Sequence, residues 1–137
     1  MNTIPTNQIA TAVSQYFSAS RSQDKVTAMV DCFSETCVVQ DPADRAAMYG
    51  KEVLRNYFDQ VVQQFSALGL TEEYVAINGN QAAVKWVGQG TTFSGKPITF
   101  EGIDIFEIDL EGKIQQLTGF WNPEALLASL QAESLDP

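Results

Sequence analysis

The sequence predicts an α+β fold in which helices come first and antiparallel strands follow. Two patterns predict it. Apolar residues recur at helical spacing over the first 65 residues, whereas apolar and polar residues alternate, as in half-buried strands, over residues 70–121. The length of 137 residues suits one domain, and we expect a single domain over residues 1–137. Apolar residues make up 45% and charged residues 18% of the chain, as in proteins with a globular core.

Two amphipathic helices are predicted near the N-terminus. The first begins at Thr6, whose hydroxyl is suited to capping a helix, and its apolar stripe consists of Ile9, Val13, Tyr16 and Phe17. The second begins near Asp24, after a polar stretch at residues 20–23. Its apolar positions, spaced i, i+3, i+4 and i+7, are Val26, Met29, Val30 and Phe33.

Two further helices are predicted later in the chain. The clearer one spans residues 50–65, and its broad apolar face consists of Val53, Leu54, Tyr57, Phe58, Val61, Val62 and Phe65. The other begins at Asn122-Pro123-Glu124 and runs through Leu130. Asparagine is a good helix cap, and proline is favoured at the first helical position.

Strand patterns fill the rest of the sequence. A short strand at residues 37–40 ends at Asp41-Pro42, because proline cannot donate a hydrogen bond to a sheet. Asn78-Gly79 is a strong hairpin signal that follows a strand at residues 71–77. Three more strands, separated by turns at Gly95-Lys96-Pro97 and Glu111-Gly112, are expected at residues 81–93, 98–110 and 114–121.

Charge and composition exclude several classes of function. The net charge of −9 repels nucleic acid and anionic membrane surfaces. The chain has no histidine, which excludes a Ser-His-Asp triad and a histidine-based metal site. The first residues show no secretory signal, and no apolar run reaches the roughly 20 residues of a transmembrane helix. We therefore expect a cytoplasmic protein that binds neither nucleic acid nor membrane.

The two cysteines, Cys32 and Cys37, are too few for a disulfide framework and fit no zinc-binding spacing. Both lie among apolar residues, so we expect them to be buried and inert rather than redox-active. Without histidine, acid–base chemistry is left to carboxylates, tyrosines, lysines or these thiols.

One aspartate interrupts an apolar strand face. Side chains alternate along a strand, so one face of the strand at residues 98–110 carries Ile98, Phe100, Gly102, Asp104, Phe106, Ile108 and Leu110. A carboxyl group in apolar surroundings is unfavourable unless it is paired or protonated. Asp104 is therefore either a structural residue, which meets an amide or arginine or is exposed at a bulge, or a functional carboxyl group with a raised pKa.

Two other residues also have a structural and a functional interpretation. Asp41 ends an apolar strand, but Asp-Pro is a common turn dipeptide. Tyr16 lies on a helical stripe, where a tyrosine is usually a core residue with its hydroxyl at the edge. Periodicity alone does not bring Tyr16, Asp41 and Asp104 together in space.

The order of these motifs resembles the nuclear transport factor 2-like (SnoaL-like) superfamily, and most closely its ketosteroid isomerase (steroid delta-isomerase) branch. The resemblance covers nearly the whole chain. It is carried by Tyr16-Phe17, Val38-Val39-Gln40-Asp41-Pro42, Gly50-Lys51-Glu52-Val53-Leu54, Gly102-Ile103-Asp104-Ile105-Phe106, Asp109 to Gln115 and Gly119-Phe120-Trp121. It implies a cone-shaped roll, in which a strongly curved antiparallel sheet wraps around N-terminal helices and encloses an apolar pocket, in a homodimer.

The resemblance also implies an activity, the movement of a C=C bond next to a carbonyl in a small apolar substrate. Asp41 is then the general base, and Tyr16 and a protonated Asp104 form the oxyanion hole. No metal or organic cofactor is implied. The candidates for the apolar pocket wall are Phe58, Val62, Phe65, Val84, Trp86, Phe100, Phe120 and Trp121.

Some alternatives stay open at this point. A gapless alignment back from Asp41-Pro42 places Phe17 at the oxyanion position, whereas one extra residue places Tyr16 there. Polyketide cyclases and scytalone dehydratases of the superfamily rely on histidine, and limonene-epoxide hydrolases use an arginine that Gly102-Ile103-Asp104 lacks. The alternatives to an isomerase are a non-catalytic dimeric domain that binds a small hydrophobic ligand or a protein partner, and another carboxylate-driven reaction such as dehydration or hydrolysis.

Overall fold

The computed structural model describes residues 4–135. Within this range the helices are α1 (Thr6–Ser20), α2 (Lys25–Asp31), α3 (Lys51–Val62) and α4 (Pro123–Leu135). The strands are β1 (Phe33–Gln40), β2 (Met48–Tyr49), β3 (Ala67–Asn78), β4 (Gln81–Thr91), β5 (Pro97–Ile108) and β6 (Ile114–Phe120). The predicted α+β class is confirmed. None of the described helices is long and apolar enough to cross a membrane.

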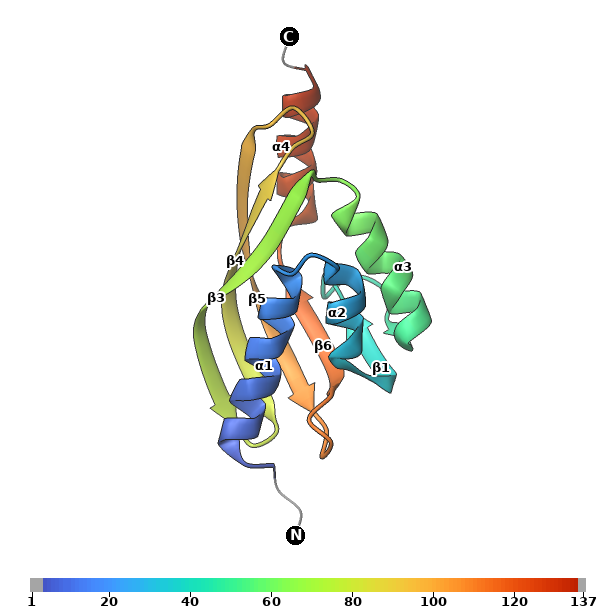
Figure 1. Cartoon of the computed structure of the whole chain (residues 1–137), viewed down its shortest axis with the longest axis vertical. Helices are drawn as coiled ribbons and strands as arrows, with labels where there is room; N and C mark the ends of the chain where they lie inside the picture. Colours follow the sequence, from blue (N-terminus) through green and yellow to red (C-terminus); the bar gives the residue numbers. More distant parts are fainter. Residues whose placement is uncertain (1–3, 136–137) are drawn as a thin grey trace.

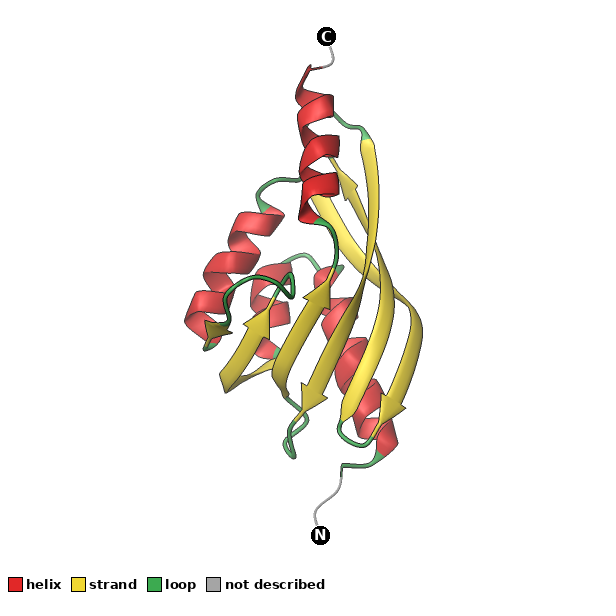
Figure 2. Cartoon of the chain, turned by 180° about the vertical axis from the view of Figure 1, so that it is seen from behind, coloured by secondary structure: helices red, strands yellow, loops and turns green. Residues whose placement is uncertain are grey.

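One curved sheet is the scaffold of the molecule. Its strand order is β2-β1-β6-β5-β4-β3, with β1 parallel to β6 and the other neighbouring pairs antiparallel. Figures 1 and 2 show α1, α2 and α3 over one face of this sheet, while α4 follows β6 and extends to the end of the molecule opposite the N-terminus. This arrangement confirms the cone-shaped roll that the resemblance implied.

The core lies between these helices and the sheet. Its largest fully buried side chains include Ile9, Phe17, Phe33, Leu54, Phe106 and Leu117. Tyr16 packs edge-on against Phe17, Phe33 and Phe106, with ring centroids 5.2, 5.8 and 5.4 Å away. Aromatic rings prefer this edge-to-face geometry, so three neighbours fix the orientation of the Tyr16 ring.

The two cysteines form no disulfide. Cys37 is fully buried, as predicted, whereas Cys32 is half-buried and its Sγ donates to the Ala28 carbonyl oxygen at 3.4 Å. Burial raises the pKa of both thiols, which disfavours the reactive thiolate.

The second predicted helix is too long. α2 ends at Asp31, and Phe33 begins β1, where it pairs with Ile114 of β6. Phe33 lies seven residues after Val26, which is the spacing of a helical apolar stripe. The chain enters β1 there and the Phe33 side chain still points into the core, so the pattern does not distinguish the two structures. The predicted cap is also wrong, since Thr6 is the first residue of α1 and its side chain makes no capping hydrogen bond.

Other boundaries differ by a few residues. β3 begins at Ala67, ahead of the predicted start, because this whole segment pairs with β4. β5 ends at Ile108, so the alternating face stops there and Leu110 is 60% exposed. α4 begins at Asn122-Pro123 as predicted but continues past Leu130 to Leu135.

Candidate active site

A narrow cavity of about 60 Å³ lies between the helices and the sheet. Its wall is formed by residues of α1, α2, α3, α4, β3, β4 and β5 and by the residues that directly follow β1 and β6. The predicted site residues that line it are Tyr16, Asp41, Phe58, Val62, Trp86, Phe100, Asp104 and Trp121. The structure thus brings together the three residues with predicted chemical roles.

Asp41 follows the end of β1 and precedes Pro42 across a cis peptide bond. Two side chains donate hydrogen bonds to its carboxyl group: Trp121 Nε1 to Oδ1 at 2.5 Å and Tyr57 Oη to Oδ2 at 3.1 Å. Burial raises the pKa of Asp41 to about 6, although the Trp121 and Tyr57 hydrogen bonds and the Arg45 charge oppose the shift. A carboxyl group with this pKa is ionised near neutrality yet basic enough to accept a proton.

Asp104 lies on β5, opposite Gly119 of β6, and is only 4% exposed. Burial and the nearby Asp41 charge raise the pKa of Asp104 well above its usual value, and Trp86 opposes the shift. Since the two carboxyl groups disfavour each other's ionisation, burial and the Asp41 charge both favour the neutral form of Asp104. The two aspartates are therefore suited to opposite tasks, one as an acceptor and one as a donor.

Tyr16 on α1 is 2% exposed and lines the cavity. Burial, followed by the charges of Asp104 and Asp41, raises its pKa well above the ordinary tyrosine value, so its hydroxyl stays protonated. Phe17, the other residue that the alignment allows at this position, is fully buried in the core and is not part of the cavity wall.

Three donors in this wall have no hydrogen-bond acceptor within residues 4–135. The Tyr16 hydroxyl makes no hydrogen bond to any described residue, and the Asp104 carboxyl group, which the Trp86 indole faces, has no acceptor for its own proton among them. The Trp86 indole N–H is buried near Asp104 but likewise has no partner with hydrogen-bond geometry. A buried donor without an acceptor costs about 1–3 kcal/mol, and a ligand oxygen in the cavity would remove that cost.

Three of the predicted wall residues do not line the cavity. Phe120 is 51% exposed, because Gly119 faces inward and side chains alternate along β6. Val84 is fully buried in the core. Phe65 is buried behind the wall, where its ring stacks on Phe100 with centroids 6.2 Å apart.

Sequence reasoning missed other wall residues. The most informative is Tyr57, which the sequence pattern places only on the broad apolar face of α3. A buried tyrosine hydroxyl usually needs a partner, and this is the signal that could have found it. Burial and the Asp41 charge raise the pKa of Tyr57, so it remains a donor to Asp41. The others, most of them apolar, are Ser20, Lys25, Met29, Val61, Leu68, Leu70 and Leu126.

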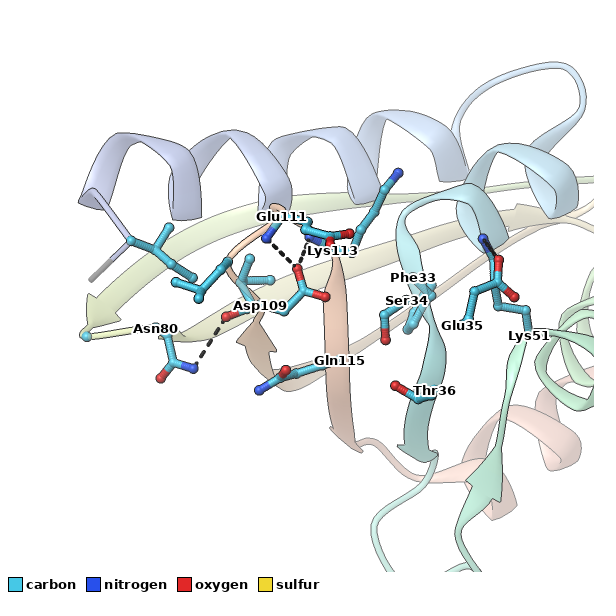
Figure 3. Close-up of a pocket in the computed structure, with 14 residues that line it drawn as sticks. Phe33, Ser34, Glu35, Thr36, Lys51, Asn80, Asp109, Glu111, Lys113 and Gln115 are labelled. Atoms are coloured by element: carbon cyan, nitrogen blue, oxygen red, sulfur yellow. Dashed lines mark hydrogen bonds and ion pairs between the residues drawn. The ribbon is translucent and has the colours of Figure 1, made fainter. Parts of the chain in front are cut away.

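A larger groove of about 850 Å³ lies elsewhere, between the start of β1 and the β5–β6 turn (Figure 3). Most of its charged groups already have partners: Asp109 Oδ1 accepts hydrogen bonds from the backbone N–H groups of Glu111 and Lys113, and Lys51 lies 3.7 Å from Glu35. The acidic side chains of its wall are exposed or half-buried. We therefore place the candidate active site in the smaller cavity.

Comparisons with solved structures establish the same fold. The epoxide hydrolase/cyclase-like enzyme SalBIII, with a role in pyran ring formation in polyether salinomycin, is 23% identical over 86% of this chain and 93% of its own, with a TM-score of 0.75. A putative SnoaL-like polyketide cyclase from Jannaschia sp. CCS1 is 17% identical over 100% of this chain and 99% of its own, with a TM-score of 0.79.

A third structure, RV0760c from Mycobacterium tuberculosis in complex with estradiol-17beta-hemisuccinate, is 17% identical over 85% of this chain and 95% of its own, with a TM-score of 0.72. No curated protein matches the sequence significantly. The family model described as the SnoaL-like domain matches residues 13–117, a span that includes Tyr16, Asp41 and Asp104. The chain therefore belongs to the SnoaL-like family and has the nuclear transport factor 2-like fold.

Proposed function

We propose that the protein is an isomerase that moves a C=C bond into conjugation with a carbonyl group in a small apolar substrate. Asp41 removes a proton from the α-carbon of a β,γ-unsaturated ketone, and the electron pair moves into the carbonyl to give a dienolate. Tyr16 and the neutral Asp104 donate hydrogen bonds to the dienolate oxygen. Asp41 then returns the proton to the γ-carbon, so that no atom is gained or lost.

The observation that carries this proposal is a contrast within the cavity: the proposed base accepts hydrogen bonds from the protein, whereas the proposed oxyanion donors have no acceptor in it. The Asp41 carboxyl group accepts hydrogen bonds from Tyr57 and Trp121, which hold it in place as an anion. The hydroxyl of Tyr16 and the carboxyl group of Asp104 have no acceptor within the described chain and line the same cavity. Preorganised donors of this kind are most effective where negative charge develops in the transition state.

A phenol that mimics the dienolate tests the proposal. In the intermediate Asp41 carries the abstracted proton and is neutral, so Asp41→Asn reproduces that charge state. We expect 4-nitrophenol to bind to Asp41→Asn as the phenolate, visible in its absorbance spectrum below the pH at which the free phenol ionises. Tyr16→Phe in the Asp41→Asn background removes one donor and should weaken phenolate binding roughly 10-fold or more.

Two results contradict the proposal. One is binding of 4-nitrophenol in its neutral form, which indicates an apolar pocket without an oxyanion hole. This result favours a non-catalytic domain that binds small hydrophobic ligands. The other is phenolate binding that Tyr16→Phe leaves unchanged, because the anion is then stabilised elsewhere.

The same acid and base suit a second reaction, the opening of an epoxide. The favouring observation is that a carboxyl group held neutral, Asp104, lies beside an ionisable base, Asp41. Asp104 gives its proton to the epoxide oxygen as the ring C–O bond breaks, and Asp41 takes a proton from the hydroxyl or water that forms the new C–O bond. Exchange with solvent then removes the proton from Asp41 and returns one to Asp104. SalBIII, which has the same fold, is described as epoxide hydrolase/cyclase-like. Turnover of an aryl epoxide, with no isomerisation of 3-cyclohexenone, distinguishes this reaction from the first.

A further inference from the structure

Lys25, the first residue of α2, is the basic side chain in the wall of the candidate active site. It is half-buried and makes no ion pair or side-chain hydrogen bond with any residue that the structure describes. The other basic residues have partners of some kind: Arg21, Arg45, Lys51, Arg55, Lys85, Lys96 and Lys113. Lys25 is thus a half-buried basic side chain of the cavity wall that no described acidic group pairs with.

Neither acidic side chain of the wall, Asp41 or Asp104, forms an ion pair with Lys25, and much of the rest of the wall carries no charge. Met29, Leu70 and Leu126 are apolar. The Ser20 hydroxyl is already used within the fold, since it donates to the Phe17 carbonyl oxygen at 2.6 Å and accepts from the Leu70 N–H at 3.0 Å. The ammonium group of Lys25 therefore keeps its donors for a group that is not part of the fold.

We propose that Lys25 binds a carboxylate of the substrate at the mouth of the cavity. The inference rests on the proposed function, because it names the class of substrate for the same site: a small unsaturated ketone with an acidic tail. Because the net charge of −9 repels anions in general, an anionic substrate needs a local positive group, and Lys25 supplies one in this cavity. One ammonium group balances the single charge of a carboxylate, whereas a phosphate monoester carries about −1.5 to −2 at pH 7.

The arrangement also sets the orientation of the substrate. Tyr16 and Ser20 lie one helical turn apart on α1, about 6 Å along its axis, and Lys25 comes after the turn that follows Ser20. The ketone end then lies deep in the cavity at Tyr16 and Asp104, and the acidic tail runs outward past Ser20 to Lys25. A substrate that reaches both groups needs a tail between its reacting ring and its carboxylate, and acids of three tail lengths probe that separation.

Matched phenols test this inference on the whole 137-residue chain. The probes are three phenols with acidic tails of increasing length, namely 4-hydroxyphenylacetate, 3-(4-hydroxyphenyl)propionate and 4-(4-hydroxyphenyl)butyrate, and the methyl ester of each. Binding is measured by calorimetry in low salt. We expect one of the acids to bind about 3- to 10-fold more tightly than its own ester, and the difference to shrink as salt is added. Lys25→Gln should abolish the preference, and Lys25→Arg should keep it.

Lys113→Gln is the control, because it removes the same charge from the wall of the other groove and should leave the preference intact. Equal binding of acids and esters overturns the inference. An acid preference that Lys25→Gln retains overturns it too, and so does a preference that Lys113→Gln removes to the same extent as Lys25→Gln. If the esters bind but no acid is preferred, only the role of Lys25 fails. If neither acids nor esters bind, the proposed function fails and the inference with it.

Discussion

The carboxyl groups of Asp41 and Asp104 meet at Gly119 of β6. A Cβ atom at Gly119 would collide with the Asp41 carboxyl group and would lie 3.1 Å from Asp104 Oδ1. The missing side chain therefore leaves room for both groups on one side of the sheet. Because two neighbouring carboxyl groups resist ionising together, the ionised Asp41 helps to keep Asp104 protonated, and a base and an acid are held at one place.

The first prediction concerns the proton acceptor. Asparagine has nearly the shape of aspartate but cannot accept the α-proton, so Asp41→Asn should lower kcat for a β,γ-unsaturated ketone by roughly two to four orders of magnitude. Conversion of 3-cyclohexenone to its conjugated isomer, followed by ultraviolet absorbance, measures this change. A thermal melt checks that the variant is folded. Full activity in folded Asp41→Asn would exclude Asp41 as the base.

The second prediction separates Asp104 from Asp41 by role. A neutral Asp104 works as a hydrogen-bond donor, and asparagine keeps a donor at nearly the same place. Asp104→Asn should therefore retain much more activity than Asp104→Ala, which should lose roughly 10²–10³-fold in kcat. If Asp104→Asn is as inactive as Asp41→Asn while still folded, Asp104 acts as an anion and the isomerase mechanism is wrong.

The third prediction concerns the pH dependence of activity. The base must be ionised, so kcat/KM should rise with pH through the Asp41 pKa of about 6. The Tyr57 hydrogen bond lowers this pKa, and Tyr57→Phe should therefore move the acidic limb of the profile to higher pH. Tyr74→Phe removes a hydroxyl from a 68% exposed side chain and should leave the limb where it is. A limb that does not move in Tyr57→Phe would mean that another group is being titrated.

The fourth prediction links the raised carboxyl pKa values to stability. The folded state holds its protons on Asp41 and Asp104 at pH values where the unfolded chain has lost them, so these groups stabilise the fold less as pH rises. For Asp41 the loss builds up between its ordinary pKa of 3.8 and about 6, and amounts to about 3 kcal/mol. For Asp104 it extends to higher pH, because its pKa is raised further.

Asp104→Asn tests the sign of this effect, because asparagine does not titrate. The melting temperature of Asp104→Asn minus that of the unaltered protein should increase as the pH is raised from 5 to 9. A difference that is constant over this range would show that the folded state does not hold a proton on Asp104 above pH 5, which contradicts a strongly raised pKa.

The fifth prediction concerns assembly. On the sheet face away from the cavity, Ile103 and Phe120 pair directly across β5 and β6 and are 45% and 51% exposed. We propose that this face is covered in a homodimer, since apolar side chains gathered on an exposed surface often mark an interface. Sedimentation should give twice the chain mass of 15.0 kDa at micromolar concentration, and Ile103→Glu should shift the protein toward monomer. A monomer at that concentration would contradict the proposal.

Local pattern accounts for much of the fold. The α1 stripe, the apolar face of α3 and the hairpins of β3 to β6 follow from side-chain spacing and turn residues, and they appear close to their predicted places. Strand periodicity also identified Asp104 as a candidate site residue, because a single carboxyl group on an apolar strand face can be recognised from the sequence alone. The ends of elements were less predictable, as Phe33 shows, because helical and strand positions can both point into the core.

The chemistry of the site depended on distances that no local pattern contains. Only packing decides that Trp121 and Tyr57 reach Asp41 from segments far apart in sequence, and that Tyr16 rather than Phe17 faces the cavity. The opposed pKa shifts arise because desolvation and charge act through space rather than along the chain. The sequence by itself determined the elements, the order of the motifs and the odd aspartate, since each is a local property. The tertiary structure decided which donors and acceptors meet, because hydrogen bonds and burial are properties of contact.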